Sequence, residues 1–297
     1  MISGYVITIL ITVAIYAILA HSLNIITGHA GQISLGHAAF FGIGAYTSAL
    51  LYTEASLPFW LSVPLAAVTA GIIGAVLGIP CLRVRDDFLA ITTMGINFVV
   101  EAVFLYIPFF GGAMGIGGIN LPDWFGREMS KPEYFILILV VFGFLLLVDY
   151  GLGRSWIGLA WASIREDEQA AEAMGVDVVR FKVLAFILGS MIAGLAGGFY
   201  AHFLTFIMPQ NFGFPMSIVI LSMVVFGGIG TRWGPLVGAL ILGVLPELSR
   251  PIMEYRTFLY GLLLMFMMRF QPDGLLGSES VLMKGIRRLV PRPSLSR

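Results

Sequence analysis

The sequence predicts an all-α fold: a polytopic transmembrane helical bundle of about eight to ten spans, some of them interrupted by glycine. Three observations predict this class. Charged residues make up only 11% of the chain, against about 25% in a soluble domain. Hydrophobic residues make up 58%, more than a soluble domain of 297 residues could cover with polar surface. The 36 glycines suit membrane helices, which use glycine for close packing.

Nine apolar runs approach the length of about 20 helical residues that a bilayer core requires. They lie at residues 4–23, 33–52, 58–80, 88–109, 134–150, 181–205, 216–230, 235–248 and 256–270. The runs 216–230 and 235–248 are short, and a glycine-rich stretch at 227–235 separates them. Two spans, one kinked span and a re-entrant pair all fit this stretch.

Lysine and arginine predict the orientation, because cytoplasmic loops carry an excess of these residues. With the N-terminus outside and nine crossings, 13 of the 17 basic residues lie inside and 4 lie outside. The inside set is Arg83, Arg85, Arg154, Arg165, Arg180, Lys182, Arg232, Arg269, Lys284, Arg287, Arg288, Arg292 and Arg297. The outside set is Arg127, Lys131, Arg250 and Arg256. We therefore expect an external N-terminus and a cytoplasmic C-terminus.

The longest polar interruption, residues 151–180, lies inside in this orientation. Ser163 and Glu166 match a capping box, which satisfies backbone donors at a helix start, and Gly175 suits a left-handed helix end. We expect a short helix over about 164–174 that acts as a rigid peg against a cytoplasmic partner. The alternative is a helix lying on the membrane, which its acidic residues disfavour because anionic headgroups repel them.

We predict that a cytoplasmic partner contacts this loop at nine residues. These residues are Arg165, Glu166, Asp167, Glu168, Ala171, Glu172, Ala173, Met174 and Gly175.

A second candidate site is a poor helix at residues 24–46, where five glycines alternate with polar residues. Each glycine costs about 1 kcal/mol relative to alanine, and polar groups at membrane depth must be satisfied by protein or water. A broken helix that lines a pathway accounts for both facts. Close helix packing accounts for the glycines equally well. The candidate pathway residues are Asn24, Gly28, Gly31, Gln32, Ser34, Gly36 and His37.

A third candidate site is the stretch 227–239, whose glycines permit a tight turn. A structural turn is one interpretation and a cytoplasmic gate is the other. The residues concerned are Gly227, Gly228, Gly230 and Thr231.

The sequence offers no catalytic motif. It has no phosphate-binding loop of the Gly-x-x-x-x-Gly-Lys type, no Gly-x-Ser-x-Gly and no His-Glu-x-x-His, so we expect neither an enzyme nor a resident ATP site. The one cysteine and four scattered histidines suggest no metal site, and no cofactor is expected. The zero net charge implies no nucleic-acid partner.

Three motifs resemble the permease subunits of the branched-chain amino acid importers, which are ATP-binding-cassette transporters. The first is Asn-Ile-Ile-Thr-Gly-His-Ala-Gly-Gln-Ile-Ser-Leu-Gly-His-Ala-Ala-Phe-Phe-Gly-Ile-Gly-Ala-Tyr at 24–46. The second is Ala-Ser-Ile-Arg-Glu-Asp-Glu-Gln-Ala-Ala-Glu-Ala-Met-Gly-Val at 162–176. The third is Gly-Gly-Ile-Gly-Thr-Arg-Trp-Gly-Pro-Leu-Val-Gly-Ala at 227–239. The resemblance covers about residues 20–272. It implies a transmembrane permease domain over 1–280, with its coupling loop at 151–180. The lysines and arginines near the end of the chain predict a basic cytoplasmic tail over 281–297, which is either a solvated segment or a contact with anionic membrane lipids.

The resemblance also implies the activity and the partners. The expected function is alternating-access import of leucine, isoleucine or valine across the bacterial plasma (inner) membrane. The partners would be a second, related permease in a heterodimer, two cytoplasmic ATP-binding subunits and an external substrate-binding protein. Import of urea, short amides or other amino acids is an alternative substrate class. An ion-coupled secondary transporter is an alternative of another kind, for which intramembrane Glu101 is the sequence support.

Overall fold

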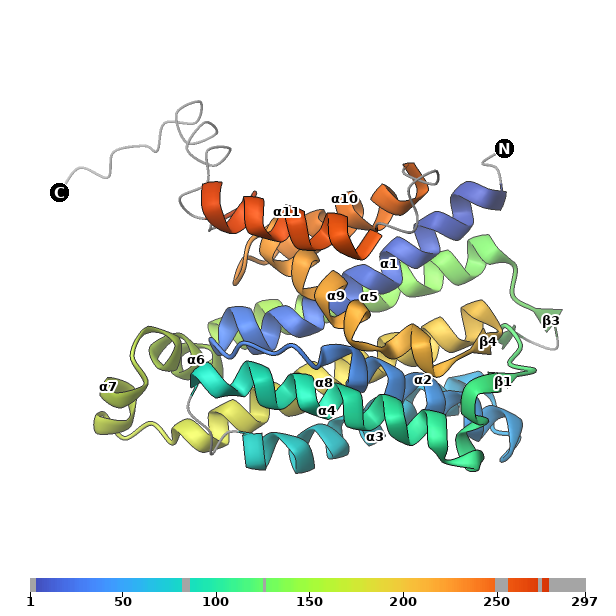
Figure 1. The fold of residues 1–297 in the computed structure, drawn as a ribbon, viewed down its shortest axis with the longest axis horizontal. Coiled ribbons are helices and arrows are strands. Elements are labelled where there is room, and N and C mark those ends of the chain that lie inside the picture. The colour runs from blue at the N-terminus through green and yellow to red at the C-terminus, as the bar shows by residue number, and fades with distance from the viewer. Residues whose placement is uncertain (1–3, 82–85, 125–126, 249–255, 272–273, 278–297) are drawn as a thin grey trace.

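Long helices run mostly lengthwise through the structure, a computed structural model that describes residues 4–81, 86–124, 127–248, 256–271 and 274–277 (Figure 1). Within these residues, six helical stretches are long and apolar enough to cross a membrane. They are Gly4–His29, Phe59–Ile79, Phe88–Tyr106, Lys131–Arg154, Val178–Leu204 and Pro209–Gly227. An all-α, multi-pass helical bundle is thereby confirmed.

The helices follow the apolar runs of the sequence in order. They are α1 (Gly4–Asn24), α2 (His37–Thr53), α3 (Phe59–Cys81), α4 (Asp86–Tyr106), α5 (Lys131–Arg154), α6 (Trp156–Glu166), α7 (Glu168–Ala173), α8 (Val178–Leu204), α9 (Phe214–Gly227), α10 (Gly234–Leu248) and α11 (Arg256–Phe270). A π-helix η1 (Ile25–His29) extends α1, and the short 3-10 turns are η2 (Pro108–Phe110), η3 (Gly112–Met114) and η4 (Pro209–Phe212).

Helix α8 lies at the centre of the bundle and packs against α1, α2 and α3. Glycines allow these close approaches. A Cβ on Gly44 of α2 would overlap the backbone of Gly194 on α8, and a Cβ on Gly197 would overlap the carbonyl of Phe41. Small residues at helix crossings let backbones approach in this way. For Gly44 the packing interpretation is therefore correct.

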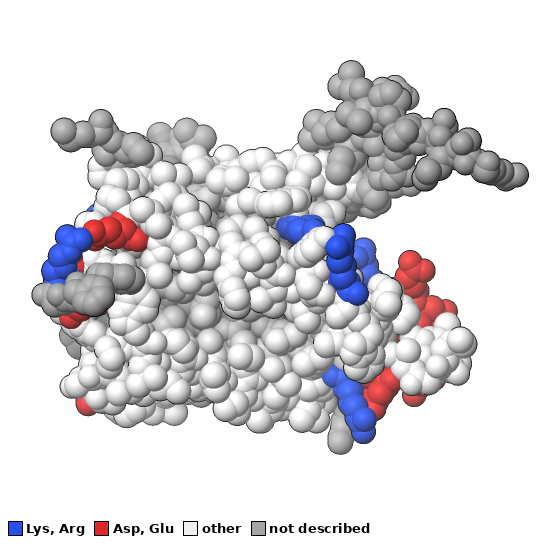
Figure 2. Space-filling view, turned by 180° about the vertical axis from the view of Figure 1, so that it is seen from behind, with Lys and Arg blue, Asp and Glu red and all other residues white. Residues whose placement is uncertain are grey.

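Charged side chains gather at the two ends of the bundle, and an uncharged belt lies between them (Figure 2). Large apolar side chains are exposed along this belt, among them Ile72, Val76, Val99, Val140 and Phe144. Exposed apolar surface of this extent is compatible with lipid and not with water. The belt therefore marks the part of the bundle that lies in the membrane.

Short strands close the end of the bundle at which α1 begins (Figure 1). Strand β1 (Ile116–Gly117) pairs antiparallel with β4 (Phe206–Ile207), and β2 (Asp123–Trp124) pairs with β3 (Arg127–Glu128). The register pairs Ile116 with Ile207 and Asp123 with Glu128. Helices α6 and α7 lie at the opposite end (Figure 1). Residues 110–133 and the loop 151–180 thus lie at different ends, as the nine-crossing prediction requires.

The segment 216–248 forms two separate helices, α9 and α10, that pack on each other. Gly228 and Gly230 take left-handed φ values of 122° and 74° in the turn between them. This excludes one continuous kinked span. Two spans and a re-entrant pair each consist of two such helices, and the choice between them stays a prediction. The predicted basic tail, 281–297, lies outside the described residues.

The helix predicted at 164–174 is wrong in its start. Helix α6 runs through Ser163 to Glu166, and the Ser163 hydroxyl donates to the Ala160 carbonyl at 2.8 Å, inside the helix. The chain breaks at Asp167, which is extended (φ −156°, ψ 110°) and accepts from the Ala170 N–H at 2.9 Å. Aspartate caps helices at least as well as serine, and the capping box needs a non-helical residue at its first position. Gly175 has φ 90°, as predicted for the helix end.

Candidate functional site

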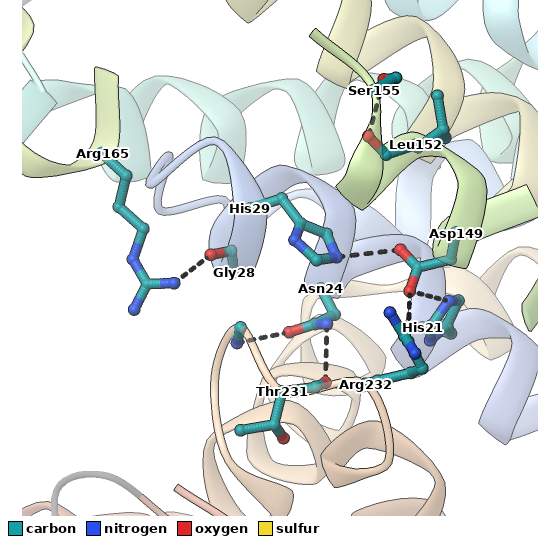
Figure 3. A network of polar contacts seen from close by, with 11 residues as sticks. His21, Asn24, Gly28, His29, Asp149, Leu152, Ser155, Arg165, Thr231 and Arg232 are labelled. Atoms are coloured by element: carbon teal, nitrogen blue, oxygen red, sulfur yellow. Dashed lines mark hydrogen bonds and ion pairs between the residues drawn. The ribbon is translucent and has the colours of Figure 1, made fainter. Parts of the chain in front are cut away.

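Four segments far apart in the sequence meet in one polar junction near α6, at the end of the bundle that carries α7 (Figure 3). They are the end of α1 with η1, the end of α5, the end of α6 and the turn between α9 and α10. We call this the polar junction and define it by His21, Asn24, Gly28, His29, Asp149, Arg165, Gly230, Thr231 and Arg232. It joins residues from all three candidate sites of the sequence.

The break between α1 and α2 supplies the first wall of the junction. Helix α1 widens into the π-helix η1, and residues 30–36 are not helical before α2 begins at His37. Gly31 has φ 73°, a conformation that favours glycine. A broken helix at 24–37 is therefore confirmed, and π-helical turns of this kind recur at functional sites.

Asn24 connects this broken helix to the α9–α10 turn. Its Oδ1 accepts from the Gly230 N–H at 2.8 Å, and its Nδ2 donates to the Thr231 carbonyl at 3.2 Å. Gly28 and Gly230 lie so close that a Cβ on Gly28 would overlap Gly230. Asn24, Gly28, Gly230 and Thr231, predicted as parts of two separate sites, thus form one contact.

Arg165 connects the same contact to the loop 151–180. Its Nη1 donates to the Gly28 carbonyl at 2.6 Å (Figure 3). A Cβ on Gly31 would lie 3.2 Å from the Arg165 Cα, so the arginine packs on the glycine backbone. A Cβ on Gly230 would overlap the Arg165 guanidinium. Because Glu168 begins α7 only three residues later, α7 and the broken helix are joined through one side chain.

Asp149 completes the junction, and sequence reasoning missed it. It is 3% exposed, and its Oδ1 lies 2.9 Å from His29 Nε2. Its Oδ2 lies 3.7 Å from His21 Nε2 and 3.9 Å from Arg232 Nε. A carboxylate buried without such partners would cost several kcal/mol, so these three basic groups explain its burial. The available signal was an ionisable residue at the end of an apolar run.

Helix α7 is anchored to α8 from its other side. Lys182 Nζ lies 2.6 Å from Glu168 Oε2, and the lysine side chain is 7% exposed. Ile164, Ala171 and Val178 form a small buried cluster that joins α6, α7 and α8. In contrast, Glu172, Ala173 and Met174 are exposed. The α7 turn therefore offers a free surface on a rigid base.

Seven of the predicted pathway and gate residues are not among those that define the junction: Gly31, Gln32, Ser34, Gly36, His37, Gly227 and Gly228. Gln32 and Ser34 are buried, and their side chains have no hydrogen-bond partner within the described ranges. His37 Nε2 lies 2.6 Å from the Ser22 hydroxyl, inside the bundle. Gly36 packs against Thr93, whose carbonyl a Cβ would overlap. Gly36 is thus closely packed, and a role for it in a pathway stays a prediction.

Comparisons with known proteins agree with the three motifs. A family model described as the branched-chain amino acid transport system permease component matches residues 5–268. The chain belongs to this permease family. The permease protein LivM of the high-affinity branched-chain amino acid transport system of Escherichia coli K12 is 35% identical over 288 residues, which are 88% of this chain and 68% of that protein. The corresponding LivH of Escherichia coli K12 is 26% identical over 291 residues, 90% of this chain and 92% of that protein.

A more distant permease, the probable LivM of Methanocaldococcus jannaschii, is 23% identical over 336 residues, 95% of this chain and 96% of that protein. No solved structure matches the chain. The resemblance read from the sequence is confirmed at the level of the family.

The permease also has a hollow of about 670 Å³ beside α7. Its walls come from α6, the end of α7 and the start of α8, with Trp156, Leu159 and Met174 among its lining. These three side chains are 71%, 68% and 86% exposed.

Within the described ranges, no group of three or more His, Cys, Asp or Glu side chains is arranged to hold a metal ion.

Proposed function

We propose that this chain is a permease subunit of an ATP-driven importer for leucine, isoleucine or valine. The observation that carries the proposal is the hydrogen bond from Arg165 to the Gly28 carbonyl, at 2.6 Å. It joins an exposed, firmly based turn to a broken helix at the end of a membrane span. An ATP-binding subunit that displaces this turn would therefore also displace the membrane spans, through the Arg165 side chain.

The proposed mechanism is alternating access driven from outside the chain. ATP binding in two cytoplasmic subunits moves α7, and Arg165 carries the motion to η1 and to the α9–α10 turn. The contact of Asn24 with Gly230 and Thr231 then acts as the inner gate. Discrete polar contacts of this kind have two arrangements, made and broken, and thus suit a two-state gate.

The proposed partners follow from the relatives. LivM and LivH are both named as permeases of one branched-chain amino acid transport system, which supports a heterodimer of two related permeases. Two ATP-binding subunits and an external substrate-binding protein complete the proposed complex. We place the N-terminus outside and α7 in the cytoplasm of a bacterial inner membrane. The permease domain would be 1–280, and the basic tail 281–297 would contact lipid headgroups.

Reconstitution tests this function directly. The chain is purified from its native host, and the proteins that accompany it are identified. We expect an ATPase and a second permease, and uptake into proteoliposomes that requires ATP and the external binding protein. Uptake driven by an ion gradient through the chain alone would instead identify a secondary transporter.

The secondary transporter remains the second candidate because one observation favours it. Asp149 is buried beside two histidines near the end of a membrane helix, an arrangement found in proton relays.

The substrate class needs its own test. Binding of leucine, isoleucine, valine, urea and a short amide to the partner binding protein should favour the three branched amino acids. Preference for urea would assign the alternative substrate.

A further inference from the structure

A hollow of about 230 Å³ lies between α1, α8 and the segment that leads into α9. Its lining includes Tyr16, Tyr200, Gln210 and Asn211 on the polar side and Met216 and Val219 on the apolar side. It shares no residue with the polar junction. None of the three sequence motifs contains it.

The hollow lies at membrane depth. Asn24 of α1 and the turn after α9 meet at the polar junction. Tyr16 stands eight residues before Asn24, about 12 Å along the helix at 1.5 Å per residue. The first residue of α9 stands about 20 Å from its last, which adjoins the junction. Both distances fall inside a bilayer core of about 30 Å.

Three polar side chains of the hollow, those of Tyr16, Gln210 and Asn211, make no hydrogen bond within the described part of the chain. Gln210 is exposed and Asn211 is partly exposed, and within the described residues neither side-chain amide makes a hydrogen bond. Tyr16 is only 8% exposed, yet among the same residues its hydroxyl has no hydrogen-bond partner. Lipid tails cannot satisfy amide and hydroxyl groups at this depth. The hollow must therefore face water, a protein partner or a polar ligand.

The segment that carries the two amides is held rigidly from behind. Asn97 of α4 donates to the Phe212 carbonyl at 3.3 Å and accepts from the Ser217 hydroxyl at 3.0 Å. The Phe212 ring is buried against Phe41, with ring centroids 5.2 Å apart. The amides thus stand on a fixed support, which lowers the cost of ordering them around a ligand.

A carboxylate neighbours the hollow. Glu101 lies against Gly213, the N-cap of α9, where a Cβ would be 3.0 Å from its Oε1 and Oε2. The positive end of the α9 dipole therefore already has a negative partner. Recognition in the hollow would depend on the amides and hydroxyls.

We infer that this hollow binds one small zwitterionic amino acid with an aliphatic side chain, halfway through the membrane. The amides of Gln210 and Asn211 and the Tyr16 hydroxyl would contact the charged end, while Met216 and Val219 would contact the side chain. The volume is below the 300–1,000 Å³ usual for drug-sized ligands and suits a smaller molecule. The inference rests on the proposed import function and names its binding site within this chain.

Cysteine protection tests the inference in the full reconstituted complex. The single native cysteine is replaced by Cys81→Ser, and Asn211→Cys is labelled with a small, charged thiol reagent. We expect labelling, because the hollow is wet. We also expect leucine, added at about ten times its Kd for this variant complex, to slow the labelling about tenfold. The reason is that only complexes without bound leucine react. Asn120→Cys, an exposed asparagine at the strand-covered end, is the matched control and should label at one rate with or without leucine.

Two results would overturn the site: no labelling of Asn211→Cys, or labelling that leucine leaves unchanged. Asn211→Ala is a second variant, for the case that the cysteine variant does not assemble. It should raise the KM for uptake about tenfold. An unchanged KM would also contradict the site. A complex that lacks an ATPase would instead refute the import function, and this outcome is seen before any labelling.

Discussion

At the scale of single residues, the polar junction depends on compensated charge. Asp149 is buried at the end of α5 and faces His21, His29 and Arg232 from two other segments. Arg232 and Arg154 also lie over the Tyr150 ring, 4.4 and 4.2 Å from its centroid. One carboxylate thus holds the end of α5, the end of α1 and the α9–α10 turn together.

Asp149→Asn should lower the thermal stability of the purified chain. It leaves Arg232 without its ion-pair partner and weakens the bond to His29, so we expect a loss of about 1–3 kcal/mol in the free energy of unfolding. Asp177→Asn is the control, because Asp177 pairs at the surface with Arg180, which is 86% exposed. Such pairs contribute about 0–1 kcal/mol. Equal stability of the two variants, measured by thermal unfolding in detergent, would refute the role of Asp149.

Glycine packing gives a second prediction at this scale. Gly44→Ala should destabilise the bundle by about 1–3 kcal/mol, because the new Cβ would overlap Gly194 and push α2 from α8. Gly95→Ala on α4 is the matched control, with no atom within 4 Å of the new Cβ. It should be neutral or stabilise the helix by up to about 1 kcal/mol. The reverse order of stability in detergent would contradict this packing.

At the scale of elements, α7 is a short helix whose start depends on one residue. Asp167 supplies the N-cap, and the helix ends at Ala173, with Met174 as its C-cap before Gly175. The end of this helix was predicted correctly from the sequence, because glycine readily adopts the left-handed conformation that follows the end of a helix. Its start was wrong because Ser163 and Asp167 can both cap a helix. The choice between them depends on the burial of Trp161 and Ile164, which lengthens α6.

Asp167→Ala should therefore loosen α7, and Ser163→Ala should not. Loss of the cap costs about 1 kcal/mol, which raises amide hydrogen exchange across residues 168–174 about fivefold. The Ser163 hydroxyl bonds only within α6, to the Ala160 carbonyl. Hydrogen-exchange mass spectrometry of the two variants measures this difference. Faster exchange in Ser163→Ala alone would support the capping box in place of the observed cap.

At the scale of the whole molecule, the apolar runs and the positions of lysine and arginine predicted the order of the helices and the ends at which the loops lie. Each of the nine apolar runs contains most of a helix, and the polar loops that were expected on opposite sides lie at opposite ends. The polar junction could not be predicted as a unit. Asn24, Asp149, Arg165 and Thr231 are far apart in the sequence, and only the packing of α1, α5, α6 and α9 brings them together.

The orientation of the molecule is a prediction that two positions can test. Met174→Cys should react with an impermeant thiol reagent only in inside-out vesicles, and Asn120→Cys only in right-side-out vesicles, both with Cys81→Ser. Both residues are exposed and lie at opposite ends of the bundle. Labelling of Met174→Cys from the outside would reverse the orientation and refute contact between α7 and a cytoplasmic ATPase.

The central claim is that Arg165 transmits the motion of α7 to the broken helix, and the ratio of substrate imported to ATP hydrolysed measures it. In the reconstituted complex, Arg165→Ala should lower that ratio about tenfold or more, since a charged hydrogen bond of about 1.5–3 kcal/mol is lost. The surface variant Arg180→Ala should leave the ratio unchanged. An assembled Arg165→Ala complex that imports as much substrate per ATP as the unmodified complex would contradict the claim.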